Sequence, residues 1–448
     1  MTPNDPSTPY PGTGTRTGTT TASGPAADPP TAAQVARARK AVIASSVGNA
    51  LEWFDIIVYS SFAVVISELF FPDVSGFAAL MFTFLTFAVS YVIRPVGAAV
   101  IGNWADRHGR KKALSFTILM MMLGTGLMAV APTAAVIGPV AAGLWLLVSR
   151  LIQGFSAGGE FGTATTFLVE SAPDRKAFYG SWQVATQGGA LLLASGFGLA
   201  LTTLLSKDAL YTWGWRVPFF FGMLIGPIGY YIRSRMDETE EFTAAEKLDS
   251  PLRTAFTSNV TRLLTAAGAV ALASLSVYLI LYMPTFAVKS LGLPSYAGFL
   301  GGIIAGAVTL LGTPFVGRLA DRVGPGRVML VAAAAAAVLA WPLFQLVVAV
   351  PTLAVLTIVQ VIFGALMAAY FGPLPGLYAE LFPANVRTTG MAIGYNVGVL
   401  VFGGFTGAIF TYLIQATGSK TAPSVYFVGI AVISFVTVFL ARRRFGVR

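Results

Sequence analysis

Two acidic residues lie within a segment that is otherwise apolar enough to cross a membrane. The segment SSVGNALEWFDIIVYSSF contains Glu52 and Asp55, with Asn49 and Tyr59 at helical spacing from them. An unpaired charge at that depth costs at least a few kcal/mol, so such residues face the protein interior or water. A buried carboxyl group beside a cation can exchange a proton. We therefore predict proton coupling at Asp55 and at Glu52, which lies nearer the cytoplasmic end; a static buried ion pair is the alternative.

Basic and amide side chains in two further apolar segments are candidate substrate ligands. Arg94, in FAVSYVIRPVGA, offers a planar fork that fits a carboxylate, either of a substrate or of a neighbouring helix. In LVSRLIQGFSAGGEFG, the residues Arg150, Gln153 and Glu160 recur at helical spacing. They predict a network that an entering proton or anion could break, and Glu160 is a third candidate for proton coupling. The glycines among them predict close contact with another helix.

Polar side chains at helical spacing in later segments extend the predicted substrate site. Packing between helices is the alternative for each of them. Those in the first half of the chain are Tyr59, Gln183 and Gln187, and those in the second half are Tyr278, Tyr282, Tyr370, Tyr395 and Asn396.

A short charged sequence occurs twice, about half a chain apart. GNWADRHGRKK begins at Gly102, and a degenerate copy, GRLADRVGPGR, begins at Gly317. Glycine and aspartate at these positions predict a tight turn packed against a neighbouring helix end. A second pair of related sequences begins at Glu170 and Glu380. The chain is therefore predicted to be an internal duplication.

The segments that carry these residues are predicted to be membrane-spanning helices. The chain has 448 residues, of which 55% are hydrophobic and 11% charged, too apolar a composition for a soluble protein. About 12 runs are long enough to cross a bilayer, and they lack the alternation of an outer-membrane barrel. We predict an all-α membrane protein with two six-helix pseudo-repeats. The spans are predicted to begin near residues 42, 77, 112, 138, 179, 216, 262, 297, 327, 353, 388 and 424.

The distribution of cations predicts the topology. With the N-terminus in the cytoplasm, most Lys and Arg residues fall on the cytoplasmic side, and Lys207, Arg216, Lys289 and Lys420 fall on the other. This predicts a multi-pass protein of a bacterial inner membrane with both termini in the cytoplasm. The predicted domains are a disordered tail (1–40), a six-helix bundle (41–233), a cytoplasmic linker (234–260), a second six-helix bundle (261–442) and a short cytoplasmic tail (443–448).

Composition also argues against several function classes. The net charge is +10, but the cations lie in short loops between spans, so we predict no nucleic-acid binding. The chain has no cysteine and a single histidine, His108, so we predict no metal, no cofactor and no enzymatic activity. A membrane sensor with a transporter-like fold remains an alternative of another class.

Several sequences together resemble one family. GNALEWFD, RPVGA, GNWADRHGRKK, RLIQGFSAGGEFG, SAPDRK and WGWRVPF resemble the metabolite:proton symporter family of the major facilitator superfamily, over about residues 40 to 442. Within it, SWQVATQ, YMPTFAVKSLG, ELFPANVR and VFGGFTGAIFTYLIQATG are most similar to citrate and tricarballylate carriers.

The resemblance implies inward cotransport of an organic acid with protons by alternating access. We predict a monomer in the lipid bilayer. A carboxylate such as citrate is the first expected substrate. An aromatic acid, a shikimate-like acid or a compatible solute is the alternative, because compatible-solute carriers share an arginine at the position of Arg94. The resemblance also implies that the repeated charged sequences gate the conformational change, through Gly102, Asp106, Arg107, Gly109, Arg110, Asp321 and Arg322.

Overall fold

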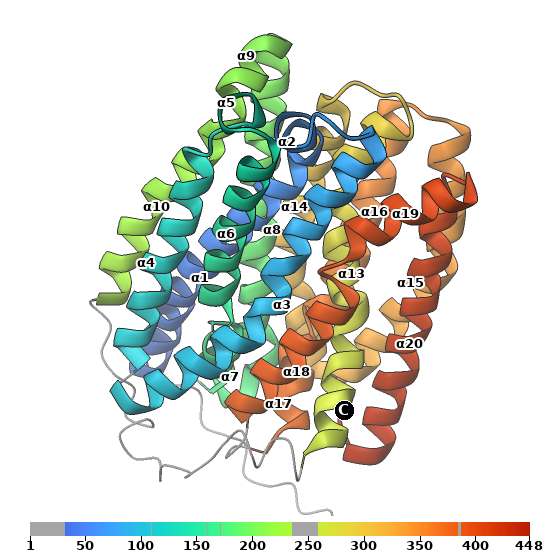
Figure 1. Cartoon of the computed structure of the whole chain (residues 1–448). Coiled ribbons are helices and arrows are strands. Elements are labelled where there is room, and N and C mark those ends of the chain that lie inside the picture. Colours follow the sequence, from blue (N-terminus) through green and yellow to red (C-terminus); the bar gives the residue numbers. More distant parts are fainter. Residues whose placement is uncertain (1–31, 109, 159, 171, 235–258, 384–386) are drawn as a thin grey trace, which may run out of the picture.

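The computed structural model describes residues 32–108, 110–158, 160–170, 172–234, 259–383 and 387–448. Within these ranges every regular element is a helix, and the long helices stand side by side as a bundle (Figure 1). We call α1 to α10 the N-terminal half and α13 to α20 the C-terminal half. The upper end is the one that carries α2, α5 and α9 in Figure 1, and the lower end carries α7, α17 and the end of the chain.

The helices of the N-terminal half are α1 (Ala32–Ser61), α2 (Ala63–Phe70), α3 (Gly76–His108), α4 (Arg110–Ala129), α5 (Ala134–Ile137), α6 (Pro139–Ala157), α7 (Glu160–Glu170), α8 (Lys176–Leu204), α9 (Lys207–Thr212) and α10 (Val217–Ser234). Two short 3-10 helices, η1 (Pro173–Arg175) and η2 (Gly214–Arg216), precede α8 and α10. Those of the C-terminal half are α13 (Val260–Lys289), α14 (Tyr296–Val323), α15 (Pro325–Ala349), α16 (Leu353–Phe371), α17 (Leu374–Leu381), α18 (Arg387–Phe402), α19 (Thr406–Thr417) and α20 (Ala422–Phe445).

Several of these helices, alone or in consecutive pairs, are long and apolar enough to cross a membrane. The described ranges contain nine such spans, and α1 with α2, bent by 63°, makes a tenth if the pair is one span. The shorter α4 and α10 run beside them (Figure 1). A helix satisfies its own backbone groups, which lipid cannot do. With the broken pairs α1–α2, α6–α7, α16–α17 and α18–α19 each taken as one passage, each half has six passages, which confirms the predicted fold class.

For eleven of the predicted spans, the predicted first residue lies within three residues of the first residue of a helix. The first does not, because α1 begins at Ala32. Residues 32–40, predicted to belong to a disordered tail, are therefore helical; their alanines, arginines, glutamine and lysine are strong helix formers. The rest of the predicted tail and most of the linker lie outside the described residues, and those domain boundaries stay predictions.

The predicted turn that begins at Gly102 is wrong in its extent. Helix α3 continues through Asp106 and Arg107 as far as His108, and α4 begins at Arg110. The stretch has no proline, and its alanine and charged residues can continue a helix. At the second copy the turn is present: α14 ends at Val323, Gly324 has φ +97°, and Pro325 starts α15. A φ in that range favours glycine, and proline suits the first helical position.

Small residues bring the two halves together. A Cβ added at Gly188 or Gly306 would lie within 3 Å of the facing helix, so α8 and α14 are in close backbone contact at mid-length. Near the lower end, a Cβ on Gly317 would meet Ser181 of α8 at 2.6 Å. The predicted glycine seam of the fourth span also lies at helix contacts, since a Cβ on Gly154 would fall 2.1 Å from the carbonyl oxygen of Ser90. Such contacts are typical of helices packed in a membrane.

Candidate functional site

The first carboxylate of α1 pairs with an arginine of α3. The Glu52 Oε1 atom lies 2.8 Å from the Arg94 Nη2 atom, and both side chains are buried. The guanidinium group of Arg94 also lies over the ring of Tyr91, 4.4 Å from its centroid. In a buried pair of this kind each charge compensates the other, so removing one partner would leave an uncompensated charge in the interior.

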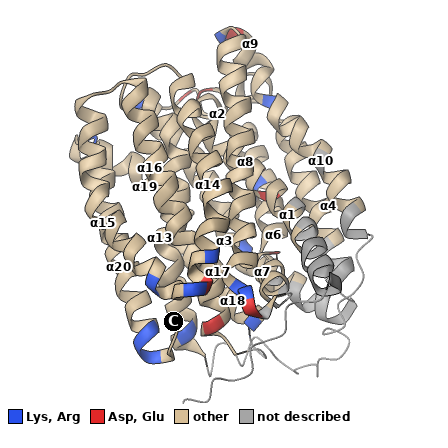
Figure 2. Cartoon of the chain, turned by 180° about the vertical axis from the view of Figure 1, so that it is seen from behind, with Lys and Arg blue, Asp and Glu red and all other residues tan. Residues whose placement is uncertain are grey.

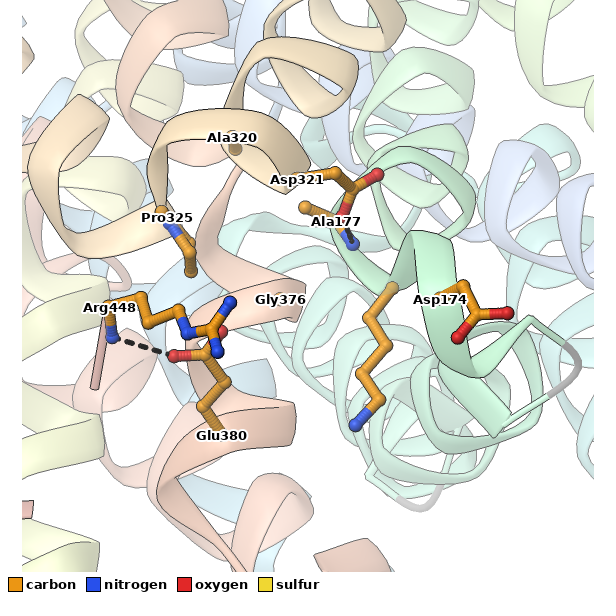
Figure 3. A pocket seen from close by; sticks show the side chains of 10 residues that line it. Asp174, Ala177, Ala320, Asp321, Pro325, Gly376, Glu380 and Arg448 are labelled. Atoms are coloured by element: carbon orange, nitrogen blue, oxygen red, sulfur yellow. Dashed lines mark hydrogen bonds between the residues drawn. The ribbon is translucent and has the colours of Figure 1, made fainter. Parts of the chain in front are cut away.

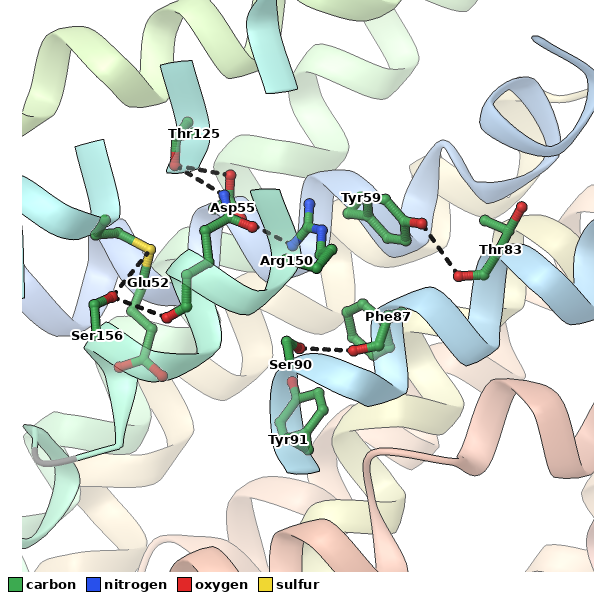
Figure 4. Close-up of polar contacts among 12 residues, drawn as sticks. Glu52, Asp55, Tyr59, Thr83, Phe87, Ser90, Tyr91, Thr125, Arg150 and Ser156 are labelled. Atoms are coloured by element: carbon green, nitrogen blue, oxygen red, sulfur yellow. Dashed lines mark hydrogen bonds and ion pairs between the residues drawn. The ribbon is translucent and has the colours of Figure 1, made fainter. Parts of the chain in front are cut away.

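The second carboxylate pairs with an arginine of α6. The Asp55 Oδ2 atom lies 3.1 Å from Arg150 Nη1, and its Oδ1 atom accepts a hydrogen bond of 3.0 Å from Thr125 of α4. Gln153 donates to the Thr125 hydroxyl at 3.2 Å, and Arg150 lies over the ring of Tyr59 at 3.9 Å. Figure 4 shows Asp55 between Thr125 and Arg150, with Tyr59 beyond. The network predicted for Arg150 and Gln153 is thus present, and it includes Asp55.

Aromatic and amide groups connect this polar cluster to the C-terminal half. The hydroxyls of Tyr91 and Tyr278, on α3 and α13, are hydrogen-bonded to each other. Asn396 of α18 donates to the carbonyl oxygen of Gly158 at 3.0 Å, and Tyr395 stacks on Phe161 of α7 with ring centroids 3.4 Å apart. Three of the predicted ligands therefore lie where the halves meet.

The break between helices α18 and α19 faces Tyr91 and Tyr278. Residues 403–405 form a turn between the two helices. A Cβ on Gly403 would meet the Tyr278 ring at 2.6 Å, and one on Gly404 would meet the Tyr91 side chain at 2.9 Å. Broken helices near the midplane are where transporters of this architecture place substrate groups.

Many polar atoms around these pairs are buried without a hydrogen-bond partner. Native proteins seldom leave such atoms unsatisfied, so each one calls for an explanation, and a ligand is one. They are Arg94 Nε, Arg150 Nε and Nη2, Gln153 Oε1, Gln183 Nε2, both polar side-chain atoms of Gln187, Ser274 Oγ and Asn396 Oδ1.

Other predicted residues have different surroundings. Tyr370 donates to the carbonyl oxygen of Ala269 at 2.7 Å, so its hydroxyl joins α16 to α13 within the C-terminal half, which agrees with the packing alternative. Tyr282 bonds to Thr411 of α19 and its ring contacts Phe84 of the N-terminal half. Glu160 is buried at the start of α7. Within the described ranges no group of His, Asp or Glu residues could hold a metal ion.

The predicted gating residues are described only in part. At the lower end, the Asp321 carboxylate accepts hydrogen bonds from the backbone N–H groups of Ala177 and Phe178, at 2.9 and 3.0 Å. The first turn of α8 offers such N–H groups and a positive dipole end. Arg322 is exposed. The structure does not describe the surroundings of the other predicted gating residues, which are Gly102, Asp106, Arg107, Gly109 and Arg110.

A cavity of roughly 300 Å³ lies beside this contact (Figure 3). Asp321 and Ala177 line one side of it, and Glu380 of α17 lines another. Glu380 accepts a hydrogen bond of 2.8 Å from the backbone of Arg448. The cavity therefore lies at the lower end between the two halves and apart from the buried ion pairs.

Residues important to the cluster were missed in the sequence. Tyr91 lies one turn before Arg94 on the same helix, which is a signal that could have been used. Thr125, in LGTGLM, and the Gly403–Gly404 pair carry little signal, because a threonine or a glycine within an apolar span is common.

Within the described residues, two halves of six helical passages, with charged pairs buried in the N-terminal half, are typical of a membrane transporter. The model of the Major Facilitator Superfamily matches residues 46–408 and 304–448. The chain belongs to the Major Facilitator Superfamily. This membership confirms the predicted fold and the prediction that the chain is not an enzyme.

Relatives of known description include several carriers. The citrate-proton symporter of Klebsiella pneumoniae is 36% identical over 410 residues, covering 90% of this chain and 92% of that protein. The alpha-ketoglutarate permease of Escherichia coli is 33% identical over 91% of this chain and 95% of that protein. The glycine betaine/proline/ectoine/pipecolic acid transporter OusA of Dickeya dadantii is 32% identical over 90% of this chain and 82% of that protein. The resemblance to citrate carriers is confirmed.

Solved structures show the same fold. A D-xylose-proton symporter superposes with a TM-score of 0.73 at 16% sequence identity, covering 91% of this chain and 98% of that one. At that identity the likeness concerns the arrangement of helices.

Proposed function

We infer that this transporter carries an organic acid into the cell together with protons, by alternating access. The observation that supports this most is the pair of buried arginines, Arg94 and Arg150, each matched to a carboxylate and each with an N–H group that lacks a partner. Arginine is suited to a carboxylate ligand. Glu52, Asp55 and Glu160 are the candidate proton carriers, and the citrate-proton symporters among the relatives support coupling to protons.

Energetics also favour coupling to protons. Moving one negative charge into a negative-inside cell costs about 2.3 kcal/mol per 100 mV. A di- or tricarboxylate therefore accumulates only if cations enter with it, and the buried carboxyl groups offer a place for protons. We propose citrate as the first substrate to test.

A compatible solute is the second candidate, and one observation favours it. The rings of Tyr91, Tyr278, Phe161 and Tyr395 lie close to Arg94 and Glu52 between the halves. Aromatic faces attract quaternary ammonium groups, and glycine betaine carries one beside its carboxylate. The betaine and proline carriers among the relatives give this candidate further support.

We propose that the lower end faces the cytoplasm of a bacterial inner membrane. In Figure 2 the Lys and Arg positions, coloured blue, gather at that end, around α17, α18 and the end of α20. Cations accumulate on the cytoplasmic side of membrane proteins. In this orientation Asp321 holds the cytoplasmic end closed, and the pair of Lys289 with Glu68, 3.1 Å apart, holds the outer end closed. We propose that the protein acts as a monomer.

Uptake into proteoliposomes tests the function. Labelled citrate is supplied with and without an inward proton gradient, and alpha-ketoglutarate, phthalate, shikimate and glycine betaine are added as competitors. Gradient-dependent citrate uptake supports organic-acid symport. Gradient-dependent uptake of glycine betaine, without citrate uptake, would favour the second candidate, and uptake of none of these compounds would refute both.

A further inference from the structure

The two buried ion pairs are built alike. In each, a carboxylate of α1 pairs with an arginine that lies over a tyrosine ring: Arg94 over Tyr91, and Arg150 over Tyr59. They differ in what the tyrosine hydroxyl contacts, and this difference separates their roles.

The pair of Asp55 and Arg150 is held within the N-terminal half. The Tyr59 hydroxyl donates to the carbonyl oxygen of Thr83 on α3 at 3.1 Å. Both oxygens of Asp55 accept hydrogen bonds, one from Arg150 and one from Thr125. The ion pair and these hydrogen bonds therefore join α1, α3, α4 and α6, which all belong to the N-terminal half.

The pair of Glu52 and Arg94 lies at the junction of the halves. The Tyr91 hydroxyl is hydrogen-bonded to Tyr278 of α13. A Cβ on Gly158 would fall 2.1 Å from the Arg94 carbonyl oxygen, so Gly158 packs on the helix that carries Arg94. The carbonyl oxygen of Gly158 accepts the hydrogen bond from Asn396 of α18. Arg94 therefore lies next to the contacts of Tyr91 with Tyr278 and of Gly158 with Asn396, and these contacts must change when the halves rotate against each other.

We propose that Glu52 and Arg94 form the pair that opens when the substrate binds, and that Asp55 and Arg150 stay paired as a fixed brace. A substrate carboxylate takes the place of Glu52 on Arg94, and Glu52 takes up one proton. The inference rests on the proposed function, cotransport of an organic acid with protons. The exchange balances at the pair itself: Arg94 exchanges one carboxylate partner for another, and the proton neutralises the Glu52 carboxyl group that is released, so neither Arg94 nor Glu52 is left as an unpaired buried charge.

Several charged or titratable groups face Glu52 or lie on helices packed against α1. These charged or titratable groups are Arg94 and Tyr91 of α3, Tyr395 of α18, Tyr278 of α13, Glu160 of α7, Arg150 of α6 and Asp55 on α1 itself. Helix α8 also packs against α1, but near mid-length it offers only the neutral side chains of Gln183 and Gln187.

Binding of citrate to the purified full-length protein at two pH values tests the inference. Uptake of one proton on binding makes the affinity fall about tenfold for each unit by which pH rises above the pKa of the carboxyl group. Glu52→Gln removes this carboxyl group, so its citrate affinity should no longer change with pH. Asp55→Asn, the matched control, should keep the pH dependence of the unmodified protein. Loss of the pH dependence in Asp55→Asn, with its retention in Glu52→Gln, would overturn the inference.

Infrared difference spectroscopy adds a readout that a structural role would not produce. Citrate binding should give a band of a newly protonated carboxyl group in the unmodified protein and in Asp55→Asn, and Glu52→Gln should lack it. A band that persists in Glu52→Gln would overturn the inference. Absence of binding of citrate, alpha-ketoglutarate and glycine betaine to the unmodified protein would instead refute the proposed function, so the two failures can be told apart.

Two tyrosine variants keep the test open if a carboxyl variant fails to fold. Tyr278→Phe removes the hydrogen bond between the halves, and Tyr59→Phe removes its counterpart within the N-terminal half. A lost hydrogen bond of ordinary strength corresponds to about a fivefold change in affinity. We expect about that loss of citrate affinity in Tyr278→Phe and none in Tyr59→Phe. Equal effects of the two variants, or the reverse order, would overturn the inference.

Discussion

Replacing Asp321 with asparagine should open the lower end of the transporter. The carboxylate of Asp321 on α14 accepts two backbone hydrogen bonds, of 2.9 and 3.0 Å, from the first turn of α8 in the other half. Asparagine keeps one acceptor oxygen, but its NH₂ group would face the second N–H group, and the favourable charge at the helix N-terminus is lost.

The size of the effect can be worked out from these contacts. A hydrogen bond to a charged group contributes about 1.5–3 kcal/mol, and a charge at a helix N-terminus contributes about 0.3–1 kcal/mol. Because Asp321 is partly exposed, the lower part of this range applies. A loss of about 2 kcal/mol shifts the ratio of closed to open molecules by about 30-fold.

Distance measurements between spin labels can detect this shift. The chain has no cysteine, so cysteines can be introduced at the exposed residues Arg175 and Arg327 without removing others. Asp321→Asn should increase the fraction of long distances between the labels. Asp174→Asn, a nearby exposed carboxylate on the same cavity, serves as the control and should leave the distances unchanged. Identical distance distributions for Asp321→Asn and the unmodified protein would refute the reasoning.

Further variants test other parts of the structure. Thr125→Val should slow proton-driven uptake, because Asp55 loses a buried donor worth about 1 kcal/mol; uptake at the normal rate would argue against the brace. Tyr370→Phe should lower the free energy of unfolding by about 1 kcal/mol with unchanged substrate affinity, and a loss of affinity at normal thermal stability would make Tyr370 a ligand after all. Gly158→Ala should abolish uptake or folding, because its Cβ would lie 2.1 Å from the Arg94 carbonyl oxygen. Gly429→Ala, which meets no atom within 4 Å, should leave both unchanged, and similar expression and uptake of the two glycine variants would contradict the predicted contact.

The charged residues of the site could be predicted because charge is rare within a membrane span. Glu52, Asp55, Arg94 and Arg150 each interrupt an apolar run, and the cost of placing a charge in lipid predicts that they lie in the protein interior. Helix starts could be predicted for the same reason, since the apolar runs and the loops between them differ sharply in composition.

The pairing of these charges could not be predicted from the sequence. Glu52 and Asp55 are three residues apart on α1, and only the packing of α3 and α6 around that helix assigns one to Arg94 and the other to Arg150. The sequence likewise could not tell Tyr278, which bonds across the halves, from Tyr370, which bonds to a backbone carbonyl group of its own half. Both are tyrosines in apolar spans, and their roles depend on contacts between distant segments.

Proton movement that accompanies substrate movement is the most direct test of the central claim. A pH-sensitive dye trapped in proteoliposomes, with the membrane potential held at zero, reports acidification of the interior when citrate is added outside. We expect citrate-dependent acidification by the unmodified protein and little or none by Glu52→Gln. Citrate entry with no accompanying acidification would contradict proton-coupled transport by this chain.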